Sequence, residues 1–289
     1  MWFVWALISG LTFSVALEAN KHFKLEGLTL TFWRSVMSAL LMLPLILAME
    51  WPSDPVYYLV ICLTSAVSVI GTVVQFNLAA KHNGRVANLD LPVKIVLAFL
   101  IWLVIDRVER EAFFSDPVYA GGVLASFALM IASLQFVRKN DASWSAFLAI
   151  LPIGVLYAVI GVLTKLMLDD GESVLGISLS WVFLGSILMA VTSLPLLVSQ
   201  KMSGKKLDIV SPNILKGALF CAFFATIAGV TYNFAVIATP NPGYPGVVIA
   251  MTPVWFAVYY KCMGIKDELS PVAGLFLGLS ALILLLVTL

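Results

Sequence analysis

The chain has 289 residues, of which 61% are hydrophobic and 11% are charged. Soluble domains carry about a quarter charged residues, so this chain has too little polar surface to cover a soluble globule. Its formal net charge is +1, and its basic residues are scattered through short connections, which excludes the continuous basic surface of a nucleic-acid-binding protein. We therefore expect an integral membrane protein with no nucleic acid among its partners.

Ten apolar segments are long enough to be membrane spans, since a crossing needs about 20 such residues. Backbone groups in lipid must hydrogen-bond within their own segment, which makes these segments helices. The chain start, from Met1 to Trp5, lacks the basic region and cleavage site of a secretory signal, so we assign it to the first span. In chain order the segments are 2–20, 28–49, 56–80, 86–105, 117–137, 144–168, 177–199, 213–238, 245–262 and 271–289.

The two halves of the chain repeat one pattern. Pro92 and Asp106 recur as Pro253 and Asp267, both 161 residues later, and similarity at a fixed offset indicates an internal duplication. We define the repeats as residues 1–140 and 144–289. Because each holds five spans, the second must enter the membrane with the opposite orientation, as in many secondary transporters. The expected fold class is an all-α integral membrane protein with ten transmembrane helices in two inverted five-helix repeats.

The basic residues predict an orientation. The connections after odd-numbered spans hold ten Lys and Arg residues, whereas those after even-numbered spans hold Arg107 and Arg110. Positive connections face the cytoplasm, so the charge count places both termini outside it. The expected location is a cell membrane, as a multi-pass protein of a prokaryotic inner membrane.

Short stretches at several helix ends carry a resemblance to a known family. They are Glu18-Ala19-Asn20-Lys21, Phe32-Trp33-Arg34, Asn77-Leu78-Ala79, Leu91-Pro92-Val93 and Lys266-Asp267-Glu268-Leu269-Ser270. Through them, and over nearly its whole length, the chain resembles the EamA-like members of the drug/metabolite transporter superfamily. The resemblance implies a carrier or exporter of amino acids, amines or related metabolites, with a site between the halves. It also implies both termini in the cytoplasm, opposite to the charge count, so the orientation stays open.

Glu18 is a candidate coupling residue. Ionisable side chains within spans are costly and usually functional, and Glu18 lies near the end of the first span. Ser14 and His22 share its helix face at four-residue spacing. A proton exchanged for substrate would bind this carboxylate, whereas the alternative is an interfacial Glu paired with Lys21 or His22.

Three further charges lie in the predicted spans of the first half: Arg34 in the second, and Asp90 and Lys94 one turn apart in the fourth. All three and Glu18 belong to the same half of the membrane. We assign Arg34 and Asp90 to coupling or gating. Lys94 would contact a substrate carboxylate if it is unpaired; the alternative is a buried ion-paired network that fixes the helix register.

Aromatic and amide side chains are the remaining candidates for substrate binding. An aromatic wall would stack an aromatic amino acid or attract an organic cation. The alternatives are aromatic belts at the membrane interfaces and hydrogen bonds between neighbouring helices. The candidates are Trp33, Gln75, Asn77, Tyr157, Trp181, Tyr232, Asn233 and Trp255.

Pro92 and Pro253 occupy matched places in the fourth and ninth spans. Interrupted helices at corresponding positions of two repeats indicate a binding region, so we expect kinks there and rocking of these helices as the gate. The alternative is a proline in the first turn of a helix, where it is tolerated.

The function predicted from these patterns is secondary active transport of a small organic solute by alternating access, with protons as possible coupling ions. Its partners are the solute and membrane lipids, and we expect no enzyme activity, cofactor or metal. Cys62, Cys221 and Cys262 form no metal-binding pattern. The alternative is a lipid-handling protein of the same fold, scramblase-like or flippase-like, which would have a groove open to lipid.

Overall fold

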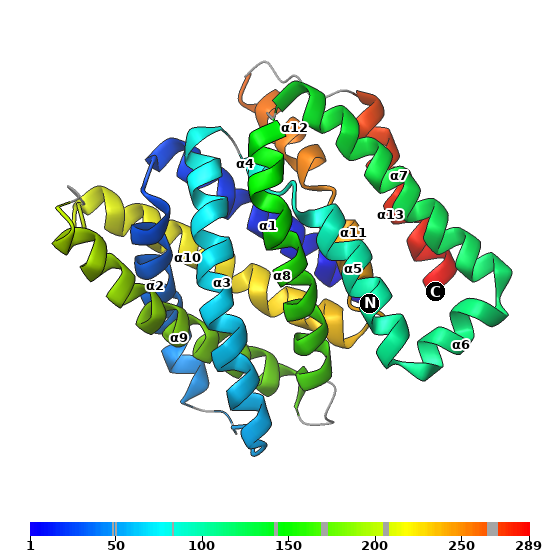
Figure 1. Ribbon diagram of the computed structural model, residues 1–289, viewed down its shortest axis with the longest axis horizontal. Helices are drawn as coiled ribbons and strands as arrows, with labels where there is room; N and C mark the ends of the chain where they lie inside the picture. The colour runs from blue at the N-terminus through cyan, green and yellow to red at the C-terminus, as the bar shows by residue number, and fades with distance from the viewer. Residues whose placement is uncertain are drawn as a thin grey trace.

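The computed structural model describes residues 1–47, 49, 51–82, 84–141, 144–168, 173–204, 208–264 and 271–289. In these residues the regular structure is entirely helical (Figure 1). The helices are α1 (Trp2–Phe23), α2 (Gly27–Ile46), α3 (Pro55–Lys81), α4 (Gly84–Ala87), α5 (Leu91–Ile105), α6 (Arg107–Ser115), α7 (Pro117–Asp141), α8 (Trp144–Leu168), α9 (Val174–Met202), α10 (Pro212–Ile237), α11 (Tyr244–Ile249), α12 (Thr252–Cys262) and α13 (Pro271–Thr288).

Several helices are long and apolar enough to cross a membrane. In the described part of the chain there are seven, namely α1, α2, α3, α9, α10, α13 and residues 150–168 of α8. The pair α6 and α7 would make an eighth, although its two helices meet at 99°. The prediction of a multi-pass, all-helical membrane protein is therefore confirmed. In the described residues each of the ten predicted segments coincides with a helix over most of its length, but two of them are divided into shorter helices.

Local sequence explains where the helices begin. The side chain of Glu26 accepts a hydrogen bond of 2.8 Å from the Thr29 amide at the start of α2. Asp54 caps α3 in the same way, and Pro55 occupies the first turn of that helix. A capping carboxylate satisfies an amide that the helix cannot, and a first-turn proline has no amide to satisfy. These residues fix the short connections between spans.

The two divided segments are the predicted fourth and ninth spans. The fourth consists of α4 and α5, separated by residues 88–90, and the ninth consists of α11 and α12, separated by residues 250–251. Pro92 and Pro253 lie in the first turns of α5 and α12. The expected kink within a continuous helix is therefore replaced by a break, and each proline starts the helix that follows the break.

A glycine from the other half packs against each break. A Cβ atom on Gly154 of α8 would lie 2.8 Å from the Asp90 carbonyl oxygen and 2.9 Å from the Val93 Cβ. A Cβ atom on Gly10 of α1 would lie 3.2 Å from the Ile249 Cα. The first helix of each half thus packs directly against the divided helix of the other half, with a glycine at the point of contact.

Helices from the two halves alternate across the bundle. The pairs that pack together include α1 with α10, α2 with α9, α3 with α8, α5 with α8, and α7 with α13. In Figure 1, α7 and α13 run side by side at one edge, and α2 and α9 lie toward the opposite edge. The largest cluster of buried apolar side chains joins α1, α5, α7, α11 and α13.

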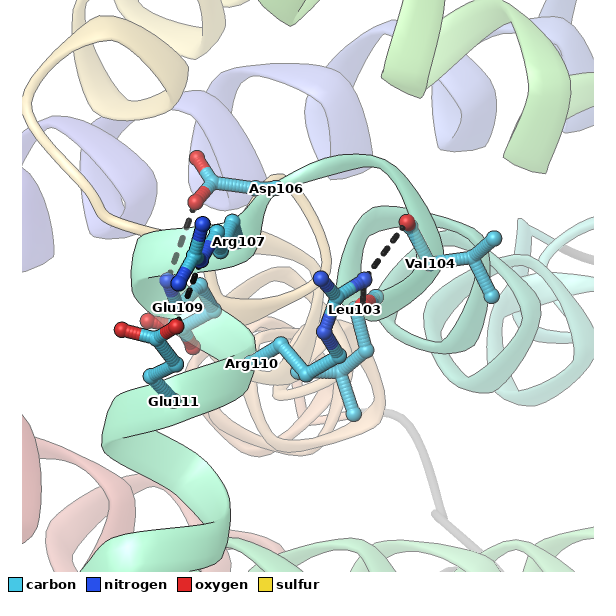
Figure 2. A network of polar contacts seen from close by, with 7 residues as sticks. All are labelled: Leu103, Val104, Asp106, Arg107, Glu109, Arg110 and Glu111. Atoms are coloured by element: carbon cyan, nitrogen blue, oxygen red, sulfur yellow. Dashed lines mark hydrogen bonds and ion pairs between the residues drawn. The ribbon is translucent and has the colours of Figure 1, made fainter.

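A sharp corner joins α5 to α6 (Figure 2). The Asp106 carboxylate caps α6 by accepting a 2.9 Å hydrogen bond from the Glu109 amide. Arg110 folds back and donates 3.0 Å and 3.4 Å bonds to the Val104 and Leu103 carbonyls at the end of α5. Both helix ends at the corner are therefore satisfied, which holds α6 in a fixed direction.

Candidate functional site

A cavity of about 290 Å³ lies between the two halves. Its lining comes from α1, α2, α3, the start of α5, α8, α9, α10 and α11, so both halves contribute. Six of the predicted substrate-binding residues and two of the predicted gating residues line it. They are Gln75, Lys94, Tyr157, Trp181, Tyr232 and Asn233, together with Arg34 and Asp90.

The other predicted residues lie elsewhere. The indole N–H of Trp33 donates a 2.7 Å hydrogen bond to the Ile209 carbonyl, which ties α2 to the segment before α10. The Asn77 side chain accepts a 2.8 Å bond from the Gly27 amide at the start of α2. Trp255 faces a different cavity. Neither Pro92 nor Pro253 is part of the central lining.

Lys94 is surrounded by aromatic rings. Its Nζ lies 4.8 Å from the centre of the Tyr232 ring and 5.8 Å from that of Tyr157. Each ring face attracts a cation. No ion pair joins Lys94 to Asp90 or to any other carboxylate of the described chain. The ammonium group is thus held by ring faces and remains available to an anion.

Asp90, one turn before Lys94, belongs to a chain of polar contacts that also includes Tyr157. Its Oδ1 accepts a hydrogen bond of 3.4 Å from the Gln75 amide. The Tyr157 hydroxyl donates to the Gln75 Oε1 at 3.4 Å and lies 3.4 Å from the Thr72 hydroxyl. Asp90 is 1% exposed, and its Oδ2 has no hydrogen-bond partner among the described residues. These long contacts leave the carboxylate incompletely satisfied.

Arg34 supplies a second cation to the cavity. Its guanidinium donates to the Met189 sulfur at 3.6 Å and lies 5.8 Å from the centre of the Phe76 ring. Its Nε is buried without a hydrogen-bond partner in the described chain. Among the described residues no ion pair joins Arg34, Asp90 and Lys94 to one another, so the alternative of an ion-paired network between them is not seen in this conformation.

Glu18 forms a contact between the halves at one end of α1. Its Oε1 accepts a 2.5 Å hydrogen bond from the Tyr260 hydroxyl of α12 and lies 3.4 Å from the Lys21 ammonium. Its Oε2 accepts a 3.2 Å bond from the Gly84 amide of α4. We call this set the Glu18 latch. It joins α1 to α4 and α12, so one carboxylate holds parts of both divided helices.

A second cavity of about 280 Å³ lies on the other side of α1. Ser14, Glu18 and His22 all line it, as their four-residue spacing predicts. Its other walls are apolar residues of α1, α10 and α12, and several of these are exposed on the outer surface of the bundle. Helix α1 therefore separates the central cavity from an outer, largely apolar one.

Glu109 forms a second contact between the halves, which the sequence analysis missed. Its Oε1 accepts hydrogen bonds of 2.7 Å from the hydroxyls of both Tyr119 and Tyr244, and these hydroxyls lie 2.6 Å apart. We call this set the Glu109 latch. The available signal was an amphipathic stretch between Asp106 and Asp116, beginning with an acidic cap and a Glu three residues later.

The described residues contain no group of three or more His, Cys, Asp or Glu side chains that could hold a metal ion. Cys221 is buried, and its thiol contacts the Ala16 carbonyl at 3.3 Å. Cys62 and Cys262 are exposed and apart from the cavity. The residues that line the central cavity offer charge, hydrogen bonds and ring faces to a ligand.

Comparison with known proteins gives the fold alone. No family model matches the chain, and no curated protein matches its sequence. A solved structure described as "Crystal structure of protein" superimposes with a TM-score of 0.69, over 99% of this chain and 96% of that chain, at 14% sequence identity. The chain thus shares its whole fold, from end to end, with a structure of very different sequence.

Proposed function

We propose that the protein is a secondary transporter of a small organic solute, of the EamA-like kind within the drug/metabolite transporter superfamily, and that it works by alternating access. The observation that carries this proposal is the composition of the central cavity. Its walls come from α1, α2, α3 and α5 of the first half and from α8, α9, α10 and α11 of the second half, so each half contributes its first three long helices and one part of its divided helix. A solute site shared in this way can be exposed first by one half and then by the other.

The packing between helices supports an inverted repeat with ten crossings. Under the repeat, α1 corresponds to α8, α2 to α9, α3 to α10, and α7 to α13. A two-fold axis allows α2 to pack on α9 and α7 on α13, and it requires the contact of α1 with α10 to be matched by one of α8 with α3; all of these contacts occur. In this proposal, α4 with α5 and α11 with α12 are the broken fourth and ninth crossings.

One contact has the reciprocity that a two-fold axis demands. The Ser126 hydroxyl of α7 donates to the Ser280 carbonyl at 2.9 Å, and the Ser280 hydroxyl of α13 donates to the Ser126 carbonyl at 2.7 Å. The reciprocal approach of Gly10 and Gly154 to the two breaks is consistent with the same axis.

The two latches are the gates in this mechanism. Tyr244 begins α11 and Tyr260 lies near the end of α12. The Glu109 latch and the Glu18 latch therefore hold opposite ends of the α11–α12 segment. Release of one latch while the other stays closed would open the cavity to one side. Protonation of Glu18 would remove the negative charge that Lys21 and Tyr260 contact, which makes this latch the coupling step.

Alternating access can be tested without knowing the solute. Cys62, Cys221 and Cys262 are first replaced by Ser, and Ser68, which lines the cavity, is replaced by Cys. A membrane-impermeant thiol reagent is applied to either side of oriented vesicles. We expect Cys at position 68 to react from both sides, because the cavity opens to each in turn. Reaction from one side alone would refute the mechanism.

Cross-linking each latch in its closed state tests whether the latches are the gates. Paired Cys substitutions of Glu18 and Tyr260, joined by a flexible bifunctional reagent, should abolish labelling from one side. Paired substitutions of Glu109 and Tyr244 should abolish it from the other side. The same reagent applied to the variant without either pair is the control, and equal labelling in all three cases would exclude the latches as gates.

A lipid-handling function is the second candidate, favoured by the outer cavity. That cavity is mostly apolar and is bordered by exposed Leu11, Phe220 and Val258, which suits contact with acyl chains. Movement of a fluorescent lipid between leaflets of proteoliposomes measures this activity. Rapid movement that stops when the outer cavity is filled by Val15→Trp would favour this candidate over solute transport.

A further inference from the structure

The central cavity has an excess of positive charge. Three ionisable side chains other than tyrosines line it, and two of them, Arg34 and Lys94, are cations, whereas Asp90 is the only acid among the lining residues described. Unpaired charges within a membrane are costly and mark substrate or ion pathways. A bound anion would offset this excess, and a bound cation would increase it.

The cations are also accessible to a ligand. Lys94 lies over the faces of Tyr232 and Tyr157, at 4.8 Å and 5.8 Å, and no carboxylate of the described chain forms an ion pair with it. Arg34 has a sulfur and a ring as its neighbours, and its Nε has no hydrogen-bond partner in the described chain. Ring faces and sulfur are weak partners compared with a carboxylate, so an incoming anion meets little competition.

The remaining wall sets the shape of the ligand. Phe13, Phe76, Tyr157, Trp181 and Tyr232 surround the polar groups, and the Tyr232 hydroxyl is a buried donor with no partner among the described residues. Flat rings stack on aromatic walls. The volume of about 290 Å³ is near the lower end of the range for small-molecule pockets, about 300–1,000 Å³. This favours a ligand with one ring over a nucleotide or an intact lipid.

We propose that the cavity binds a small aromatic monoanion, with its carboxylate between Arg34 and Lys94 and its ring against the tyrosine and tryptophan wall. The inference rests on the transport function proposed above, since it names the solute class of the same site. Among the amino acids, amines and related metabolites that the transport proposal allows, the inference singles out solutes with a net negative charge. The excess of a single positive charge matches an anion better than a zwitterion, and opposes an organic amine.

Three probes that share a phenyl ring but differ in net charge test which charge the cavity prefers. Phenylpropionate is an anion, phenylalanine is a zwitterion and phenethylamine is a cation. Binding to the purified full-length protein in detergent is measured by calorimetry and by thermal stabilisation, because a ligand of the folded state raises the apparent stability. We expect phenylpropionate to bind most tightly and phenethylamine not to bind. Binding of phenethylamine or phenylalanine at least as tight as that of phenylpropionate would overturn the proposal.

Two substitutions of Lys94 test whether this residue binds the carboxylate of the ligand. Lys94→Met should weaken phenylpropionate binding about 10- to 100-fold, the range expected when a charge-assisted hydrogen bond is lost, and Lys94→Arg should restore most of it. Lys201→Met removes an exposed cation at the end of α9 and is the matched control. Unchanged affinity in Lys94→Met would overturn the assignment.

A purely structural role of Lys94 gives a different result. An unpaired, partly buried charge facing the cavity does not stabilise the protein without its ligand, so Lys94→Met should have a Tm at least as high as that of the parent while it loses anion binding. A lower Tm together with unchanged binding would show that Lys94 serves the fold. The labelling of Cys at position 68 distinguishes the two proposals, because it tests alternating access whether or not an anion binds.

Discussion

The Glu109 latch makes a quantitative prediction about stability. Glu109 is 5% exposed and accepts two hydrogen bonds of 2.7 Å from Tyr119 and Tyr244. Hydrogen bonds to charged groups contribute about 1.5–3 kcal/mol each, which gives about 3–6 kcal/mol for the pair. Two effects offset part of this in Glu109→Ala: the tyrosine hydroxyls keep their 2.6 Å contact with each other, and a buried carboxylate is removed. We therefore expect a loss of about 2–4 kcal/mol.

The same helix provides the control. Glu111 pairs with Arg107 at 2.6 Å, but its side chain is 63% exposed, and exposed pairs at this spacing contribute about 0.3–0.5 kcal/mol. Thermal unfolding in detergent should show a Tm lowered by about 5–12 °C in Glu109→Ala and nearly unchanged in Glu111→Ala. Glu109→Gln, which keeps an acceptor, should fall between them. Equal Tm values for the two alanine variants would refute the reasoning.

Further predictions concern packing, orientation and coupling. Gly154→Ala should destabilise the protein by about 1–3 kcal/mol, because its Cβ would lie 2.8 Å from the Asp90 carbonyl, whereas Gly121→Ala, with open space around it, should be neutral or slightly stabilising; chemical denaturation of both variants checks this. With Cys62 and Cys221 replaced by Ser, an impermeant maleimide should label Cys262 in intact cells only after permeabilisation, because the charge count places this end of the ninth span in the cytoplasm; labelling of unbroken cells would support the opposite orientation. Glu18→Gln should abolish solute accumulation driven by an imposed proton gradient while binding in the central cavity is retained, and a gradient response like that of the parent would remove Glu18 from the coupling step.

Much of the architecture could be predicted because lipid imposes strict rules on sequence. A crossing must be long, apolar and helical, so the ten apolar segments coincide with helices or helix pairs. The sequence pattern also placed Pro92 and Pro253 at matched positions. It did not distinguish a kink from a break, because a proline is compatible with both and the difference depends on how closely another helix approaches. Gly10 and Gly154 provide that approach, and they lie in other spans.

The central site could be predicted only in part for a similar reason. Lys94 could be predicted because a charged residue deep in a span is costly and usually functional, and Tyr157 and Tyr232 could be predicted because rings with a polar tip suit the wall of a binding site. Trp33 and Asn77 are equally polar, but they bond to backbone groups at helix ends, and sequence alone does not reveal which neighbour lies within reach. Glu109 was missed since it lies outside the long apolar segments, in a short amphipathic helix whose direction depends on the corner at Asp106.

The reciprocal bonds between Ser126 and Ser280 bear on how the protein could move. Each serine donates one hydrogen bond to its counterpart and accepts one from it. Exchanging the conformations of the two halves would therefore leave this pair of hydrogen bonds unchanged. Helices α7 and α13, which do not line the central cavity, would then serve as a stationary pivot while the other helices swing about it. Spectroscopic labels on these two helices should keep a constant separation through the whole transport cycle.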